Sequence, residues 1–133
     1  MRSKQQDMIA RVAAIIAAII LLQTLYFKFT AHPDSVYIFS QLGLEPVGRV
    51  GIGVAELIIA ILLLVPKTRH LGAIGGLGVI SGAIFSHLTQ LGIVVNNDGG
   101  SLFGLAVITF VCCAMVAWVY RKDIPFIGGL FKE

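Results

Sequence analysis

Four apolar segments, separated by short polar connections, are the feature that most constrains the fold of this chain. They cover approximately residues 8–27, 47–65, 71–95 and 101–120. A helix needs about 20 mostly apolar residues to cross the hydrocarbon core of a bilayer. Each segment is therefore predicted to be a transmembrane helix.

The composition supports the same conclusion. Hydrophobic residues make up 57% of the 133-residue chain and charged residues only 13%, with a mean hydropathy of +0.92. Soluble domains are about 45–50% apolar and about 25% charged, and one small soluble core cannot hide this much apolar surface from water. We predict a single all-α domain over residues 1–133, an integral membrane four-helix bundle.

The connection between the first two segments is long and partly apolar. Residues 28–49 contain Phe39 and several aliphatic side chains. This pattern predicts a short amphipathic helix that lies at the membrane interface or folds back over the bundle. Asp34 or Ser35 is the expected N-cap, because short oxygen-bearing side chains accept hydrogen bonds from the first turn. Gly43 is the expected end of this helix.

The basic residues are unequally divided between the two sides of the predicted bundle. Four spans place both termini and the connection at 66–70 on one side, which carries eight Lys and Arg residues against two on the other. The positive-inside rule then predicts cytoplasmic termini, in a bacterial inner membrane. Nucleic-acid binding is disfavoured, because the charges form no basic stripe. The tail at 126–131 is predicted to be an interfacial anchor.

Small residues inside the apolar segments are expected to bring helices into close contact. Gly72 and Gly76, and likewise Gly78 and Gly82, have the GxxxG spacing that lets two membrane helices approach closely. Packing within one bundle is the simpler interpretation, and a homo-oligomer interface is the alternative. The adjacent cysteines at 112–113 are interpreted as packing residues. No spacing typical of a metal site is present.

Ionisable side chains at membrane depth carry the functional information. Glu56 lies ~13 Å into the second helix if that helix begins at Val47. His87 lies ~12 Å from the same side of the membrane if the third helix ends at Val95. A charge at mid-bilayer costs at least ~2.5–3.5 kcal/mol, so both residues are expected to face the interior, where they can pair.

Other polar residues gather at the same outer end of the bundle. Gln23 and Lys28 lie near the end of the first segment, and Gln90 is three residues after His87, on the same helix face. We predict a polar cavity that opens toward the outer leaflet. Its candidate ligand-binding residues are Glu56, His87, Lys28, Gln90 and Gln23. The alternative is a structural clasp, in which Glu56 with His87 or Lys28 only fixes the helix register.

Five short motifs in this order resemble the DoxX-like family of small four-helix membrane proteins, over nearly the whole chain. They are LYFKF at 25–29, FSQLGLEP at 39–46, GVAEL at 53–57, PKTR at 66–69 and AIFSHL at 83–88.

The resemblance implies a quinone-associated redox subunit or accessory protein. It makes Glu56, His87 and Lys28 the polar centre of a site for a quinone or a lipid-like ligand. The chain has no haem ligands, CxxC motif or nucleotide-binding loop of its own, so redox work requires a bound quinone or a partner redox subunit. The resemblance also leaves open a non-enzymatic role, either as an assembly partner of other membrane proteins or as a component of small-molecule transport.

Overall fold

The computed structural model describes residues 3–95 and 98–124, and within those residues every regular element is a helix. The main helices are α1 (Lys4–Phe29), α2 (Pro33–Gln41), α3 (Val47–Leu64), α4 (Arg69–Ser86) and α5 (Ser101–Val119). A π-helical turn, η1 (His87–Leu91), continues α4, and a 3-10 turn, η2 (Arg121–Asp123), follows α5. Four helices are long and apolar enough to cross a membrane: Lys4–Phe29, Val47–Leu64, Arg69–Leu91 and Ser101–Val119. The predicted all-α membrane bundle is confirmed.

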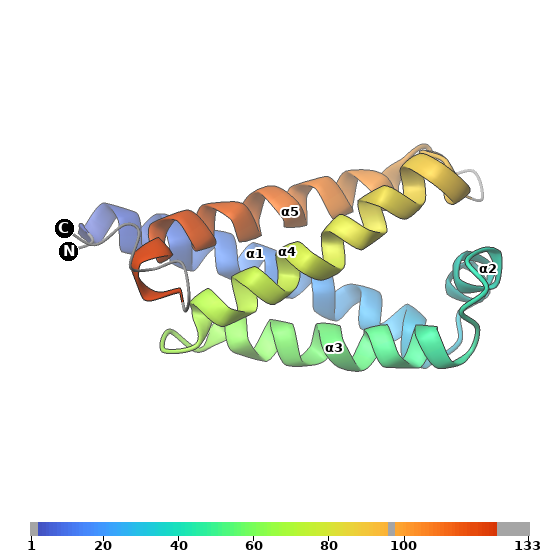
Figure 1. Cartoon of the computed structure of the whole chain (residues 1–133), viewed down its shortest axis with the longest axis horizontal. Coiled ribbons are helices and arrows are strands. Elements are labelled where there is room, and N and C mark those ends of the chain that lie inside the picture. The colour runs from blue at the N-terminus through green and yellow to red at the C-terminus, as the bar shows by residue number, and fades with distance from the viewer. Residues whose placement is uncertain (1–2, 96–97, 125–133) are drawn as a thin grey trace.

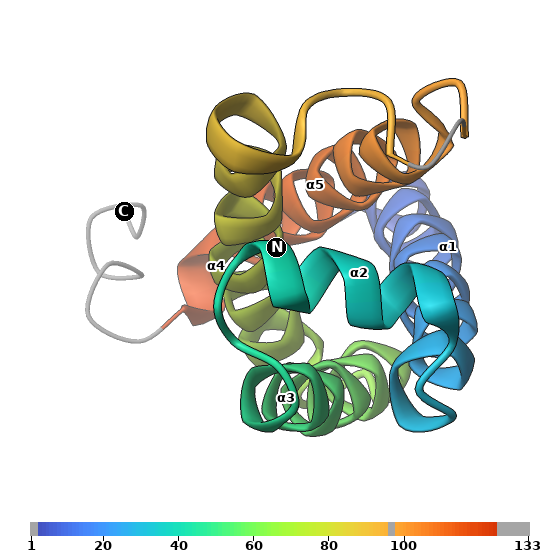
Figure 2. The same cartoon turned by 90° about the vertical axis from the view of Figure 1, so that its right-hand side faces the viewer.

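The four long helices form a ring in which each packs against two neighbours. Helix α1 contacts α3 and α5, and α4 contacts the same two helices. The start of α1 lies beside the end of α5, and α2 crosses the opposite end of the bundle (Figures 1 and 2). We call that opposite end the α2 end, and the end that holds the α3–α4 connection at residues 65–68 the turn end.

The small side chains of α1 explain how closely it packs. Five of its alanines are buried, and they follow a helical period along one face: Ala10, Ala13, Ala14, Ala17 and Ala18. The helix begins at a capping box, in which the hydroxyl of Ser3 accepts from the backbone N–H of Gln6 and the Gln6 side chain accepts from the backbone of Ser3. The outward faces of the bundle carry exposed aliphatic side chains, as expected for contact with lipid.

The α3–α4 connection is held by side chains that satisfy the last carbonyls of α3. The Thr68 hydroxyl donates to the carbonyl of Leu62 at 3.0 Å, and Arg69 Nε donates to that of Leu63 at 2.7 Å. These carbonyls have no partner within their own helix. Arg69 is consequently buried, and its guanidinium serves as a helix cap.

The glycines of α4 divide into two groups. A Cβ placed on Gly72 would lie 2.7 Å from the backbone nitrogen of Leu63, and one on Gly76 would lie 2.7 Å from Cys113 Sγ. At these two glycines α4 therefore lies close against α3 and α5. A Cβ on Gly78 or Gly82 would meet no described atom within 4 Å, so packing within the bundle does not explain this second pair.

The end of the third span and the N-cap of α2 differ from the sequence prediction. The third span ends at Leu91 rather than Val95, because Gly92 has a φ of +78° and leaves the helix. Helix α2 is capped by His32, whose Nδ1 accepts from the backbone of Asp34, rather than by Asp34 or Ser35. Gly43, with a φ of +71°, follows the end of α2 as expected. The predicted anchor at 126–131 lies outside the described residues.

Candidate functional site

A cavity of about 420 Å³ lies inside the bundle at the α2 end. All four long helices and α2 contribute to its wall, which is mainly aliphatic and aromatic. Helix α2 lies across this end of the bundle (Figure 2). Its buried Ser35 and Phe39 line the cavity. The ionisable side chains on the wall are Lys28, Asp34, Glu56, His87 and Asp98.

Lys28 and Glu56 form a buried ion pair on this wall. Lys28, in the last turn of α1, places Nζ 2.8 Å from Oε1 of Glu56 on α3. The side chains are 15% and 6% exposed, so the opposite charges offset much of each other's cost of leaving water. Glu56 Oε1 is buried, and among the described residues its partner is the Lys28 ammonium, with no further hydrogen-bond donor. A carboxylate oxygen can accept more than one hydrogen bond, so a donor on a bound molecule could add to this pair.

Arg49 holds Lys28 in place, and the sequence interpretation missed this role. Its Nε donates to both oxygens of Glu45, at 2.8 and 3.0 Å, and its Nη1 donates to the backbone carbonyl of Lys28. The first turn of α3 is thereby tied to the last turn of α1. The Glu45–Arg49 spacing of four residues is a recognisable ion-pair pattern and could have indicated it.

His87 begins the π-helical turn and is buried at the cavity wall. Its Nδ1 lies 2.9 Å from the carbonyl of Gly92, and its ring meets that of Phe103 edge-on at 5.5 Å. A carbonyl can only accept, so Nδ1 carries the hydrogen, and Nε2 of the neutral ring is an acceptor. His87 is therefore oriented by its own loop.

Of the two partners that the sequence left open for Glu56, the structure has Lys28 and not His87. Both side chains line one cavity. Glu56 pairs with Lys28, whereas Nδ1 of His87 bonds the backbone carbonyl of Gly92. The clasp alternative had named Lys28 as the other possible partner. Depth along the helices is similar for Glu56 and His87, but the π turn redirects the imidazole.

Gln23 and Gln90 are not part of the site. Both side chains are exposed, and neither lies on the described cavity wall. Gln23 is two residues from the buried Leu21, which places it on the opposite face of α1. Gln90 lies within the π turn, where the wider spiral removes the shared face expected three residues after His87.

Asp98 is a second cavity residue that the sequence interpretation did not select. Its Oδ1 accepts from the backbone N–H groups of Val95 and Gly100 at 3.0 and 2.7 Å, and its Oδ2 accepts from Leu102 at 3.1 Å. Desolvation pushes the pKa of Asp98 upward, but these donors and the nearby His87 outweigh it, so the pKa lies below its usual value. An Asp just ahead of a Gly-Gly pair and a helix is a typical loop-capping pattern.

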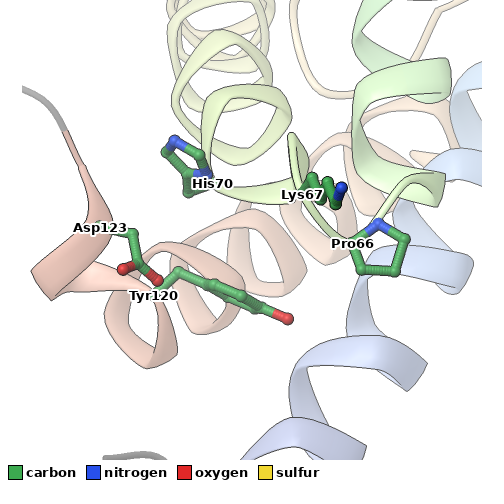
Figure 3. Close-up of a pocket in the computed structure, with 5 residues that line it drawn as sticks. All are labelled: Pro66, Lys67, His70, Tyr120 and Asp123. Atoms are coloured by element: carbon green, nitrogen blue, oxygen red, sulfur yellow. The ribbon is translucent and has the colours of Figure 1, made fainter.

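A second cavity, of about 410 Å³, lies at the turn end. Figure 3 shows its lining, which comes from the α3–α4 connection, the first turn of α4 and the residues that follow α5: Pro66, Lys67, His70, Tyr120 and Asp123. Its charged side chains are exposed or only partly buried. The first cavity is the better candidate site because Glu56 and His87 are buried in its wall and Lys28 is only 15% exposed. Burying ionisable groups is costly, so such groups usually have a function.

The first cavity has charged side chains on a mainly apolar wall, which suits a ligand with a polar head and an apolar tail. Among the described residues no group of three or more His, Cys, Asp or Glu side chains could hold a metal ion. A comparison of the chain with protein-family models, with curated proteins and with solved structures found no match.

Proposed function

We propose that this protein binds an isoprenoid quinone in the cavity at the α2 end and serves as a quinone-associated redox subunit or accessory protein of the DoxX-like type. The observation that carries the proposal is the Lys28–Glu56 pair, buried on the wall of an otherwise apolar cavity within a membrane bundle. Intramembrane charges that line a cavity usually mark a ligand or proton pathway.

The residues present fit such a ligand. The volume of about 420 Å³ falls within the range of about 300–1,000 Å³ for small-molecule sites. The Lys28 ammonium can donate to a carbonyl oxygen of the ring, and Glu56 Oε1 can accept from a ring hydroxyl. A bound quinone supplies reversible uptake of electrons together with protons. In this site Glu56 takes or returns a proton at Oε1, and a partner redox subunit would supply the electrons.

The proposed setting is a bacterial inner membrane with both termini cytoplasmic. The α2 end and its cavity would then face the outer leaflet. The unequal distribution of basic residues along the sequence supports this orientation.

A second function is favoured by one surface feature. Gly78 is exposed on α4, and a Cβ placed on it would meet no described atom within 4 Å. The outer surface of the bundle therefore has room at this position for another helix to approach closely. Small residues of this kind favour contact with another membrane helix. An assembly partner for other membrane proteins, a homo-oligomer, or a small-molecule transport component that contains this chain would each use such a face.

The test is mass spectrometry of the small molecules that co-purify with the full chain in mild detergent. Wild type should retain quinone, and Glu56→Gln should retain about tenfold less, because a charge-assisted hydrogen bond is worth about 1.5–3 kcal/mol. His87→Ala should also retain less than wild type. Gln90→Ala and Gln23→Ala are matched controls, since both side chains lie outside the cavity, and they should retain the wild-type amount.

Size-exclusion chromatography of each variant separates loss of binding from loss of folding. Equal quinone content in the folded Glu56→Gln variant and in wild type would contradict the proposal. Absence of quinone from wild type, with another membrane protein bound in stoichiometric amount, would favour the assembly role instead.

A further inference from the structure

Helices α3 and α4 touch closely at the turn end and separate toward the α2 end (Figure 1). Next to the turn, a Cβ on Gly72 would lie 2.7 Å from the backbone of Leu63. One turn further, a Cβ on Gly75 would still lie 3.1 Å from Ile59 Cγ1. The two helices are therefore in full contact over this stretch.

The next layer of the same interface is open. Gly82 lies seven residues after Gly75, and Ile52 lies seven residues before Ile59, so both keep nearly the same helix face. Gly82 and Ile52 both line the cavity. Gly82 is exposed, and a Cβ on it would meet no described atom within 4 Å. The cavity thus reaches the side of the bundle between α3 and α4.

The end of the bundle is covered instead. Helix α2 lies across it (Figure 2), and its Ser35 and Phe39 are buried against the cavity. A molecule that came from the aqueous side would have to displace α2. A molecule dissolved in the bilayer would meet the opening at Gly82 directly.

We infer that the cavity takes its ligand sideways from the bilayer, through the opening between α3 and α4 at Gly82. The ligand class is a long-tailed lipid whose polar head reaches the Lys28–Glu56 pair and whose tail lies in the opening. The Lys28–Glu56 pair supplies both a donor and an acceptor for such a polar head, on a wall that is otherwise mainly apolar. The inference rests on the proposed function, because it concerns the same site.

Gly82→Leu tests the route, because its side chain would extend into the opening. Gly78→Leu is the matched control, since Gly78 is also exposed and without close neighbours but does not line the described cavity wall. Each full-length variant is placed in lipid nanodiscs. Binding is measured for a ubiquinone with a ten-isoprene tail and for the same benzoquinone without its tail.

Gly82→Leu should weaken binding of the long-tailed quinone about tenfold or more, while binding of the tail-free ring stays within about twofold of wild type. Gly78→Leu should change neither. Wild-type binding of the long-tailed quinone by Gly82→Leu would overturn the lateral route and leave the proposed function intact. Equal loss of both ligands would also overturn the route, because the new side chain would then fill the head site. Failure of wild type to bind either molecule would overturn the proposed function itself.

Discussion

The two ends of this bundle bury their contents in different ways. At the turn end, helices meet through alanine and glycine, and a basic side chain, Arg69, is used to cap the carbonyl of Leu63. At the α2 end the helices separate, and a basic side chain, Lys28, faces the carboxylate of Glu56 across a cavity. Buried Arg69 at the turn end bonds backbone carbonyls, whereas at the α2 end Lys28 and Glu56 pair with each other on a cavity wall.

This difference indicates that the two ends of the bundle have different roles, close packing at the turn end and a cavity at the α2 end. Close packing through small residues is a main source of helix association in lipid, where no hydrophobic drive exists between helices. The turn end can therefore supply stability while the α2 end gives up packing for a cavity. Variants at the two ends should therefore lose stability for different reasons, loss of an ion pair at the α2 end and overpacking at the turn end.

The largest effect is expected where a buried charge loses its partner. Lys28→Met should lower the free energy of unfolding by about 3 kcal/mol, because Glu56 would lose the cation that offsets the cost of burying its carboxylate. The double variant Lys28→Met/Glu56→Gln should regain much of this loss, since neighbouring residues are energetically coupled. Thermal unfolding of each detergent-solubilised variant measures the differences.

Lys67→Met, at an exposed position of the turn end, is the control for the loss of a positive charge. It should change stability by less than about 0.5 kcal/mol. Losses in the two single cavity variants that simply add in the double variant would show that the pair is not coupled, and the α2 end would then not depend on its ion pair.

The next effect should appear at the turn end. Gly72→Ala places a methyl group 2.7 Å from the backbone nitrogen of Leu63, which cannot move without shifting α3. Overpacking of this kind costs about 1–3 kcal/mol. We expect a lower unfolding temperature with unchanged relative affinity for the cavity ligand. Gly78→Ala on the same helix should not destabilise the protein, because alanine has the higher helix propensity and its methyl group would meet no described atom within 4 Å. A similar loss in that control would mean that the close approach of α4 to α3 is not the cause.

The sequence was sufficient for the fold because hydropathy alone determines which segments can cross a bilayer. The four spans, the short helix over residues 33–41 and the packing role of Gly72 and Gly76 follow from composition, turn residues and spacing. These properties depend on single segments or on one helix face.

The site was only partly predictable, because it depends on how helices are rotated against one another. Depth calculations brought Glu56 and His87 to one cavity, as the structure has them, but could not choose between Lys28 and His87 as the partner of Glu56. The π turn redirects His87 and exposes Gln90. The α-helical periodicity of the sequence gives no sign of where such a turn begins. The position of Gln23 outside the cavity could have been predicted, because the helical period places it on the face opposite the buried Leu21.

The smallest effect concerns the loop that closes the cavity beside His87. Because the pKa of Asp98 is below its usual value in the folded protein, its ionised form stabilises the fold. That contribution is complete above the ordinary aspartate pKa of about 3.9 and is lost as the pH falls through the lower folded value. Asp98→Asn keeps one acceptor oxygen but loses the charge, so it should cost about 1 kcal/mol near neutral pH and flatten this part of the acid dependence. Unfolding temperatures of wild type and Asp98→Asn between neutral pH and about pH 3 measure both. If the unfolding temperatures of the two proteins stay equally far apart across the acid range, the hydrogen bonds from the three backbone donors stabilise the loop, and the charge of Asp98 does not.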